Sequence, residues 1–134
     1  MERTATCSCG QLSVTVSGDP ETHGICSCLE CQKQSGSAFS YSGYWRKSAV
    51  RRTSGQSTVW RRTSDSGRWG DSYFCPVCGA TVYAYMEMDP DAINIMIGNF
   101  ADPNFPPPKY AAWNVSKHDW TAFPSSCETW ETQP

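Results

Sequence analysis

The stretch Cys26-Ser27-Cys28-Leu29-Glu30-Cys31-Gln32-Lys33-Gln34-Ser35-Gly36 holds three cysteines within six residues, in the pattern C-x-C-x-x-C. A C-x-x-C pair can grip one metal ion from two sides, and Cys26 adds a third thiolate. The run itself contains no fourth ligand. Because zinc with three protein ligands keeps one coordination position open, this pattern favours a catalytic zinc site over a structural one.

Three interpretations of Cys26, Cys28 and Cys31 compete. The favoured one is an open zinc site whose fourth ligand exchanges. The second is a closed structural site, for which His23 and Cys127 are the candidate fourth ligands. The third is an empty cluster of redox-sensitive thiols. The sequence alone leaves the second and third open.

The other cysteines form two short pairs, Cys7-Ser8-Cys9-Gly10 and Cys75-Pro76-Val77-Cys78-Gly79. Each pair is followed by a glycine, where a tight turn lets backbone N–H groups face the sulfurs. Together they supply four thiolates, the closed set of a structural zinc that would clasp the first strand to the middle of the chain. A disulfide pair and an iron–sulfur cluster are the alternatives. Cys127 has no ligand spacing around it and is expected to be an ordinary free cysteine.

The length of 134 residues suits a single zinc-binding domain, residues 1–134, with a core at about 5–124 and a tail at 125–134. Leucine occurs only at Leu12 and Leu29, so aliphatic side chains alone supply little core. Six Trp, six Tyr and five Phe supply large buried rings instead, and bound zinc would add folding free energy. The composition therefore indicates a small β-rich core that bound metal stabilises.

Short alternating segments bounded by Gly, Pro, Ser or Asp predict an all-β fold. The expected strands are residues 12–17, 24–26, 38–45, 50–53, 57–63, 68–74, 81–86, 93–98 and 110–115. The segments 50–53 and 57–63 are predicted to pair as a hairpin. Residues 30–35 are expected to form a short helical turn that ends at Gly36.

The start of the chain, Met1-Glu2-Arg3-Thr4, lacks the apolar region of a signal peptide. No apolar run approaches the roughly 18 residues that a membrane-spanning helix needs. We therefore expect a cytoplasmic protein without a membrane partner. In a reducing compartment, closely spaced cysteines bind metal more often than they form disulfides; a secreted disulfide protein is the alternative.

The formal net charge is −2, and coordinated thiolates would make it more negative. An acidic balance disfavours general binding to nucleic acid. Even so, seven of the eleven basic residues lie between positions 46 and 68: Arg46, Lys47, Arg51, Arg52, Arg61, Arg62 and Arg68. They are interpreted either as solvated strand edges or as a face that attracts a carboxylate-bearing substrate.

The order and spacing of these motifs resemble the glutathione-dependent formaldehyde-activating enzyme family, which includes the centromere protein V-like proteins. The matching segments are Cys7 to Gly10, Cys26 to Lys33 with Ser35-Gly36-Ser37-Ala38-Phe39, Phe74 to Gly79, and Lys117-His118-Asp119-Trp120. The resemblance covers about residues 5–124.

The resemblance implies an Mss4-like β-tent, in which antiparallel sheets meet at an angle and are pinned at one end by zinc. It implies two Zn²⁺ per chain. Cys7, Cys9, Cys75 and Cys78 would hold the structural zinc, and Cys26, Cys28 and Cys31 would hold the catalytic one. It also implies a carbon–sulfur lyase similar to S-(hydroxymethyl)glutathione synthase, which joins glutathione to formaldehyde.

One position departs from the family pattern. The family commonly has His where this chain has Ser27, and serine cannot titrate near pH 7. A group that exchanges protons near pH 7 is therefore missing at position 27. The alternative functions are a non-catalytic zinc module for protein or nucleic-acid partners, with Trp45 and Trp60 expected to be exposed, and a thiol-based sensor.

Overall fold

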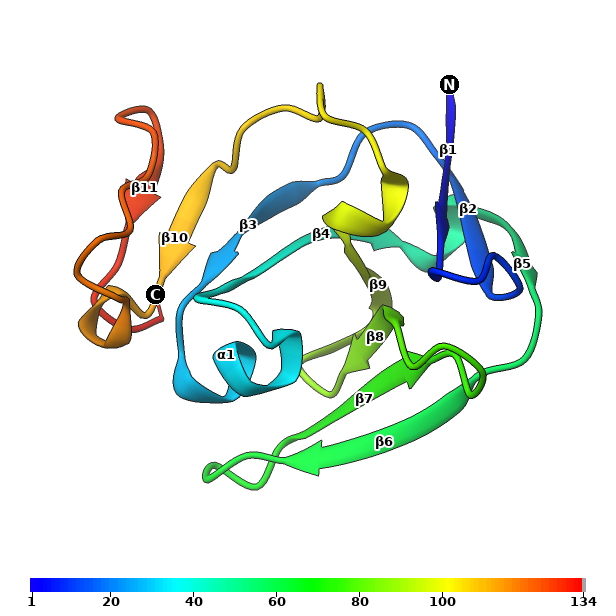
Figure 1. The fold of residues 1–134 in the computed structure, drawn as a ribbon, viewed down its shortest axis with the longest axis horizontal. Helices are drawn as coiled ribbons and strands as arrows, with labels where there is room; N and C mark the ends of the chain where they lie inside the picture. The colour runs from blue at the N-terminus through cyan, green and yellow to red at the C-terminus, as the bar shows by residue number, and fades with distance from the viewer. Residues whose placement is uncertain (134) are drawn as a thin grey trace.

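The computed structural model describes residues 1–133, which form β-strands, one α-helix and three short 3-10 helices (Figure 1). The strands are Glu2–Thr6 (β1), Ser13–Ser17 (β2), Thr22–Cys26 (β3), Ser40–Arg46 (β4), Val50–Ser54 (β5), Thr58–Thr63 (β6), Trp69–Phe74 (β7), Thr81–Met86 (β8), Asp89–Met96 (β9), Tyr110–Ala112 (β10) and Glu128–Thr129 (β11). The helices are Leu29–Ser35 (α1), Lys47–Ala49 (η1), Ile97–Phe100 (η2) and Asn114–Ser116 (η3). The predicted all-β class is confirmed.

The strands form two sheets. The smaller one has the order β1-β2-β5 and is antiparallel, and the larger one has the order β11-β10-β3-β4-β9-β8-β7-β6. Within the larger sheet, β10 runs parallel to both of its neighbours, β3 and β11. All other neighbouring strands of that sheet pair antiparallel. In Figure 1 the larger sheet bends from β10 and β3 to β7 and β6, and α1 lies in the angle.

The main core lies between the two sheets. Period-2 alternation on β2 points Val14 and Val16 inward, where they are fully buried. From the larger sheet they meet Ile93 and Ile95 of β9 and the ring of Trp45. Trp45 was expected to be exposed, but only 1% of its surface is accessible and its indole N–H donates to the carbonyl of Gly18. That expectation was wrong, because the chain has few aliphatic residues and the large ring of Trp45 fills the core in their place.

The helix α1 forms where the sequence predicted a helical turn. Cys28 is its N-cap and accepts a hydrogen bond from the N–H of Cys31. Gly36 ends it in the left-handed conformation, at φ 61°, and donates its N–H to the carbonyls of Gln32 and Lys33. The helix contains no buried residue, so its place depends on polar contacts and on the cysteines rather than on an apolar face.

The predicted hairpin between residues 50–53 and 57–63 is wrong. The strand β5 pairs with β2 in the smaller sheet, and β6 pairs with β7 in the larger one. The connection between them is held instead by Gln11, whose side chain bonds both backbone groups of Gln56. Gly55, at φ 89°, lies so close that an added Cβ would stand 1.8 Å from the Gln11 carbonyl oxygen. Alternation identified the strands but not their partners.

Several predicted boundaries also shift. The strand β1 was not predicted, the strand expected at 93–98 gives way to η2 at Ile97, and the one expected at 110–115 ends at Ala112. Trp113 causes the last change, because its φ of 61° turns the chain out of the extended conformation.

The segment at 125–134 was expected to be a tail. Within its described part, residues 125–133, β11 pairs with β10, and Trp130 stacks on Tyr110 with ring centroids 5.0 Å apart. Cys127 is buried in a small second core with Ile25 and Ala111. None of the helices in residues 1–133 is long and apolar enough to cross a membrane.

Candidate metal centre

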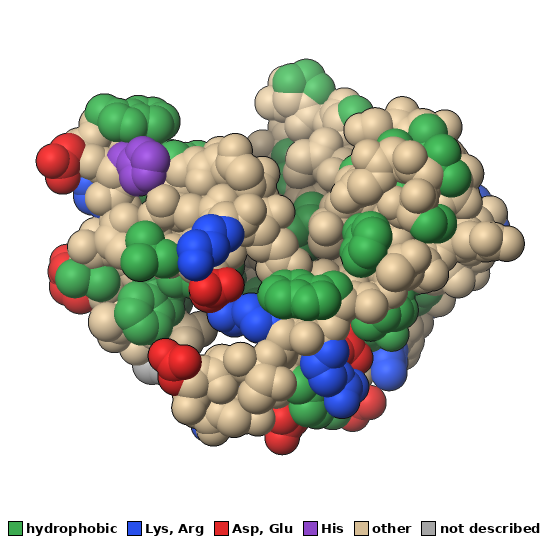
Figure 2. All heavy atoms as spheres, turned by 60° about the horizontal axis from the view of Figure 1, so that its bottom comes forward, with side chains coloured by type: hydrophobic (Ala, Val, Ile, Leu, Met, Phe, Trp, Pro, Cys, Tyr) green, Lys and Arg blue, Asp and Glu red, His purple; other side chains and the backbone are tan. Residues whose placement is uncertain are grey.

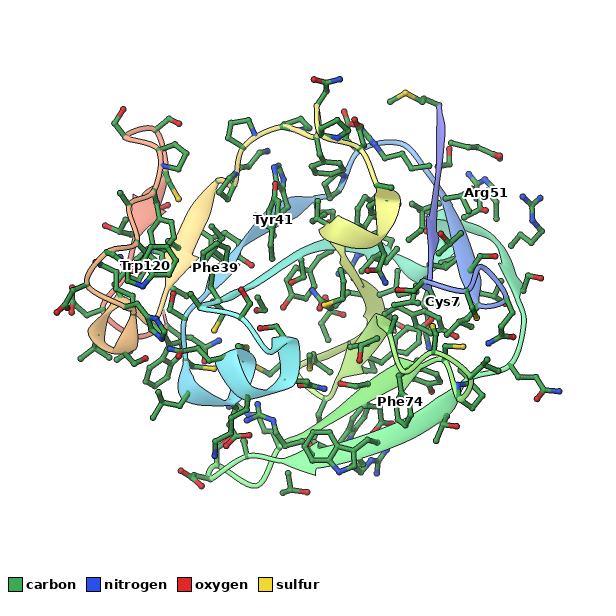
Figure 3. The ribbon with its side chains drawn as sticks, in the orientation of Figure 1. Cys7, Phe39, Tyr41, Arg51, Phe74 and Trp120 are labelled. Carbon is green, nitrogen blue, oxygen red and sulfur yellow. The ribbon has the colours of Figure 1, made fainter. Side chains whose placement is uncertain are left out.

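The first cysteine cluster consists of Cys7, Cys9, Cys75 and Cys78, whose ligand atoms all lie within 4.8 Å of one another. The turn after β1 carries the first pair, and the turn between β7 and β8 carries the second. Figure 3 shows Cys7 where the smaller sheet approaches the turn that follows Phe74. This cluster therefore joins the two sheets, as the sequence predicted for the four-cysteine set.

Several N–H groups point at the sulfurs of the first cluster. The N–H of Leu12 donates to Cys7, and the N–H groups of Val77 and Cys78 donate to Cys75. The side-chain amide of Gln11 also donates to Cys75 at 2.9 Å. Although burial opposes it, these donors lower the pKa of Cys75 to about 6. The donors thus favour a thiolate at Cys75, whereas, against the effect of a bond with the backbone of Gln11, burial and the neighbouring thiols raise the pKa of Cys9 to about 11.

The second cluster consists of Cys26, Cys28 and Cys31, again with all ligand atoms within 4.8 Å of one another. Cys26 ends β3, Cys28 caps α1 and Cys31 lies in its first turn. Hydrogen bonds from the Cys26 and Cys31 thiols, and from the N–H of Cys31, hold the pKa of Cys28 well below its usual range. The same cluster raises the pKa of Cys26, since the three thiols cannot all ionise without a cation between them.

Neither candidate fourth ligand joins this second cluster. Residues two apart on a strand share a face, so His23 lies on the opposite face of β3 from Cys26. The ring of His23 packs against Phe105, with centroids 5.4 Å apart, and its Nε2 bonds the carbonyl of Pro107 at 3.0 Å. Cys127 is buried on the far side of β10, with Ile25 and Phe123. Among residues 1–133, no fourth His, Cys, Asp or Glu completes the set.

The sheet face beside the second cluster carries polar side chains. In the register of β3 and β4, Cys26 is opposite Ser40, and Tyr44 and Tyr110 lie on the same face. Burial raises the pKa of both tyrosines, and the charges of Cys26 and Cys31 raise it further. Both phenols therefore stay neutral and can act as hydrogen-bond donors near the cluster.

Arg62 brings positive charge to the second cluster. On β6 the neighbouring Arg61 is paired with Asp71 at 2.7 Å and stacks on Trp69, so Arg62 projects from the opposite face of the strand. Its charge contributes to the low pKa of Cys28. The space-filling view of this side of the molecule is hollowed, with basic side chains in and beside the hollow (Figure 2).

Four other basic residues of the predicted face, Arg46, Lys47, Arg51 and Arg52, point elsewhere. Arg46 pairs with Glu21 and Asp89, and Lys47 lies over the Tyr85 ring. Arg51 and Arg52 are on β5 in the smaller sheet. Lys33, a weaker candidate for anion binding, is 76% exposed and pairs with Glu30 on its own helix. Of the expected basic face, Arg62 is thus the residue whose charge is seen to act on the second cluster.

A hydrogen-bond network fixes the loop of the second cluster from behind. The side-chain amide of Gln32 donates to the carbonyls of Ser27 and Ser116, at 2.8 and 2.9 Å, and its oxygen lies 3.0 Å from Nε2 of His118. Sequence reasoning missed this role of Gln32, because only the fold brings residues 116–118 to the helix. Tyr44, Tyr110 and Gln11 were missed for the same reason.

One hollow among the described residues lies away from both clusters. It has a volume of about 420 Å³ and is lined by residues that include Tyr41, Ile97 and Phe105. Figure 3 shows Tyr41 on the side of β3 and β4 away from α1. We assign the candidate site from the cysteine geometry, because this hollow offers no metal ligand but one exposed carboxylate, Asp102.

The sulfur spacing of the first cluster fits a tetrahedral metal. With metal–sulfur bonds of about 2.3 Å, two sulfurs of one zinc lie roughly 3.8 Å apart. The Cys7–Cys9 and Cys9–Cys75 sulfur distances are 3.6 and 3.7 Å, and the three sulfurs of the second cluster lie within 4.8 Å of one another. All eight cysteines are free thiols. Both clusters could therefore hold metal ions, one with four ligands and one with three.

A solved structure shares this fold. A crystal structure of a Rhodobacter sphaeroides protein, determined as a structural genomics target, superposes with a TM-score of 0.58 and 17% sequence identity. The match covers 78% of this chain and 91% of that one. The predicted all-β, Mss4-like fold is confirmed, and at this identity the likeness concerns the fold alone.

Sequence comparison identifies the family. No functionally curated protein matches the chain significantly. The sequence model of the glutathione-dependent formaldehyde-activating enzymes, however, matches residues 2–116, which contain all seven clustered cysteines. The chain therefore belongs to the glutathione-dependent formaldehyde-activating enzyme family.

Proposed function

We propose that the protein is a zinc-dependent carbon–sulfur lyase that joins a thiol such as glutathione to formaldehyde or a related small carbonyl. It would carry two Zn²⁺ and act in a reducing, cytoplasmic setting. The observation that supports this most is the second cluster, in which three thiols converge without a fourth protein ligand among residues 1–133. The family membership supports the thiol and the carbonyl as substrates.

The residues of the second cluster have distinct parts in this proposal. Cys26, Cys28 and Cys31 would hold the catalytic zinc, and Cys7, Cys9, Cys75 and Cys78 the structural one. A bound zinc would supply a Lewis acid that keeps a thiol substrate deprotonated at neutral pH. Arg62, whose charge already acts on Cys28, would attract a carboxylate of the substrate and orient its sulfur toward the cluster.

The reaction balances without an oxidant or a reductant. The substrate sulfur attacks the carbonyl carbon, a C–S bond forms, and the π electrons of the C=O bond move to oxygen. That oxygen takes up the proton that the thiol gave up. Tyr44 and Tyr110 remain neutral beside the cluster, so either can donate a hydrogen bond to the oxygen as it gains charge.

Ser27 bears on how the proton moves. Its side chain is fully buried and its hydroxyl has no partner among the described residues. Serine cannot exchange a proton near pH 7, so in this chain proton transfer would fall to solvent or to the substrate itself. The proposal therefore needs no titrating group at position 27.

Exchange NMR tests the proposed function. Glutathione and formaldehyde form the adduct slowly by themselves, and the two-zinc protein should accelerate exchange between free and hydroxymethylated glutathione. Cys28→Ser should abolish the acceleration, whereas Cys127→Ser, at a buried cysteine outside both clusters, should retain it. Exchange rates that are the same with and without protein would reject this substrate pair.

A further inference from the structure

Ser27, the residue between Cys26 and Cys28, has both of its backbone polar groups hydrogen-bonded. The N–H of Ser27 donates to the carbonyl of Ala112 at 3.0 Å. Its carbonyl accepts two hydrogen bonds, from the amide of Gln32 at 2.8 Å and from the hydroxyl of Ser116 at 2.9 Å. A carbonyl oxygen has two lone pairs, so this one is saturated. Hydrogen bonds thus restrain both peptide groups between Cys26 and Cys28, one through the N–H and the other through the carbonyl of Ser27.

The Gln32 side chain lies at the centre of this arrangement. Its amide nitrogen has two hydrogens, and both are used, on the carbonyls of Ser27 and Ser116. The amide oxygen is then left as an acceptor, which makes Nε2 of His118 the donor across the 3.0 Å contact. The hydrogen-bond pattern therefore assigns the proton of His118 to Nε2.

His118 is suited to this part by its own contacts. Its ring lies edge-on to Trp120, with centroids 6.0 Å apart, which limits the orientation of the imidazole. Figure 3 shows Trp120 at the outer end of the sheet, beside β10. A neutral imidazole with its proton on Nε2 and a charged imidazolium both donate from Nε2, so the contact survives protonation. The family match ends at residue 116, before His118.

We propose that Gln32 and His118 are positioning residues that lock the Cys26–Cys31 loop in its metal-binding geometry. His118 orients the Gln32 amide. The amide donates hydrogen bonds to the carbonyls of Ser27 and Ser116 and so holds the two carbonyls in place relative to each other. The segment after β10 thereby controls the three-thiolate site without touching the metal. The inference rests on the second cluster being a metal site, which is part of the proposed function.

The inference predicts a loss of metal affinity at one site only. Outer partners that orient metal ligands are typically worth 10–100-fold in affinity. Gln32→Met keeps the length of the side chain but removes all three hydrogen bonds, and should weaken the second site about tenfold or more. His118→Phe keeps a ring against Trp120 without the donor and should weaken it in the same direction by less.

The test is a chelator competition on the full two-metal protein, with zinc for affinity and Co²⁺ for the visible spectrum. Gln32→Met and His118→Phe should lower the affinity of the second site and shift its Co²⁺ bands, while the first site keeps both. His118→Gln, which restores an N–H donor at similar reach, should recover most of the loss. Asp119→Asn, an exposed neighbour, is the matched control and should resemble the wild type.

Two results would overturn the inference. One is wild-type affinity and spectrum at the second site in both Gln32→Met and His118→Phe. The other is an equal loss of metal from both sites, which would mean general destabilisation. His118 is exposed, so its variants test the inference even where Gln32→Met does not fold. The readout needs no turnover, so absent lyase activity would reject the proposed function and leave this inference standing.

Discussion

Gly24 is the residue that lets β10 join the larger sheet beside the second cluster. It pairs with Tyr110, and the tyrosine ring lies flat over it. A Cβ built at Gly24 would stand 2.5 Å from three ring carbons, closer than real contacts allow. Glycine is needed at this position because a side chain would collide with the Tyr110 ring, and not because the backbone has a positive φ.

Gly24→Ala should therefore force the Tyr110 ring or the whole of β10 to move. Overpacking of this kind costs about 1–3 kcal/mol in the free energy of unfolding, which urea denaturation would measure. Gly98→Ala is the control, because no heavy atom lies within 4 Å of a Cβ there and its φ is not positive. Equal stability of the two variants would mean that β10 does not lie as described.

Substitution of a cysteine inside a cluster and of one outside both clusters should differ in the number of zinc ions that the protein retains. Cys28→Ser removes one of three ligands from the second cluster and none from the first, so the purified protein should keep about one zinc instead of two. Cys127→Ser should keep both, because Cys127 belongs to neither cluster. Elemental analysis per chain gives the answer. Loss of zinc in Cys127→Ser would show that this cysteine is a ligand after all.

At the scale of elements, the sequence predicted local structure better than pairing. Alternation on β2 and β8 and the glycine cap of α1 are local signals, and they gave nearly correct boundaries, whereas β9 begins at Asp89 rather than at residue 93. The partners of β5 and β6 depend on Gln11, which is distant in sequence, so the predicted hairpin failed. The turn at Trp113 could not be predicted from the sequence, because a left-handed conformation is unusual for a bulky residue.

The strand β11 should stabilise the sheet edge next to the second cluster. It covers β10 through backbone bonds that include Glu128 N–H to the Lys109 carbonyl and Trp130 N–H to the Ala111 carbonyl, both at 2.9 Å. At about 1 kcal/mol for each net hydrogen bond, removing residues 125–134 should cost roughly 2–4 kcal/mol of stability.

Denaturation and hydrogen exchange would check this. The truncated chain should fold with lower stability, and the amides of β10 should exchange faster while those of β2 and β9 stay protected. Unchanged stability and unchanged exchange in β10 would contradict a structural part for the segment after Pro124.

For the whole molecule, the two clusters differ in which parts of the fold they connect. The first joins the two sheets and receives several N–H donors, whereas the second joins one helix turn to the end of β3. A mild chelator should therefore remove metal from the second cluster first and leave the circular dichroism of the sheets intact. Removal of the second equivalent should then unfold the chain. Simultaneous loss of both metals with unfolding would contradict this order.

The two cysteine clusters could be predicted from the sequence, because C-x-C and C-x-x-C spacing is a local property of the chain. The surroundings could not. Tyr44, Arg62 and His118 come from β4, β6 and the segment after β10, and only the fold of the larger sheet brings them near the cluster. His23 shows the converse, since it is close in sequence to Cys26 but lies on the other face of β3.

The central claim is an open zinc position that a thiol substrate can fill, and zinc K-edge X-ray absorption of the two-zinc protein tests it most directly. Seven thiolates shared by two zincs should average about three and a half sulfurs per zinc, with the remainder oxygen. Adding glutathione should raise the average to about four. Four sulfurs per zinc before any thiol is added, or no change when glutathione is added, would contradict the account.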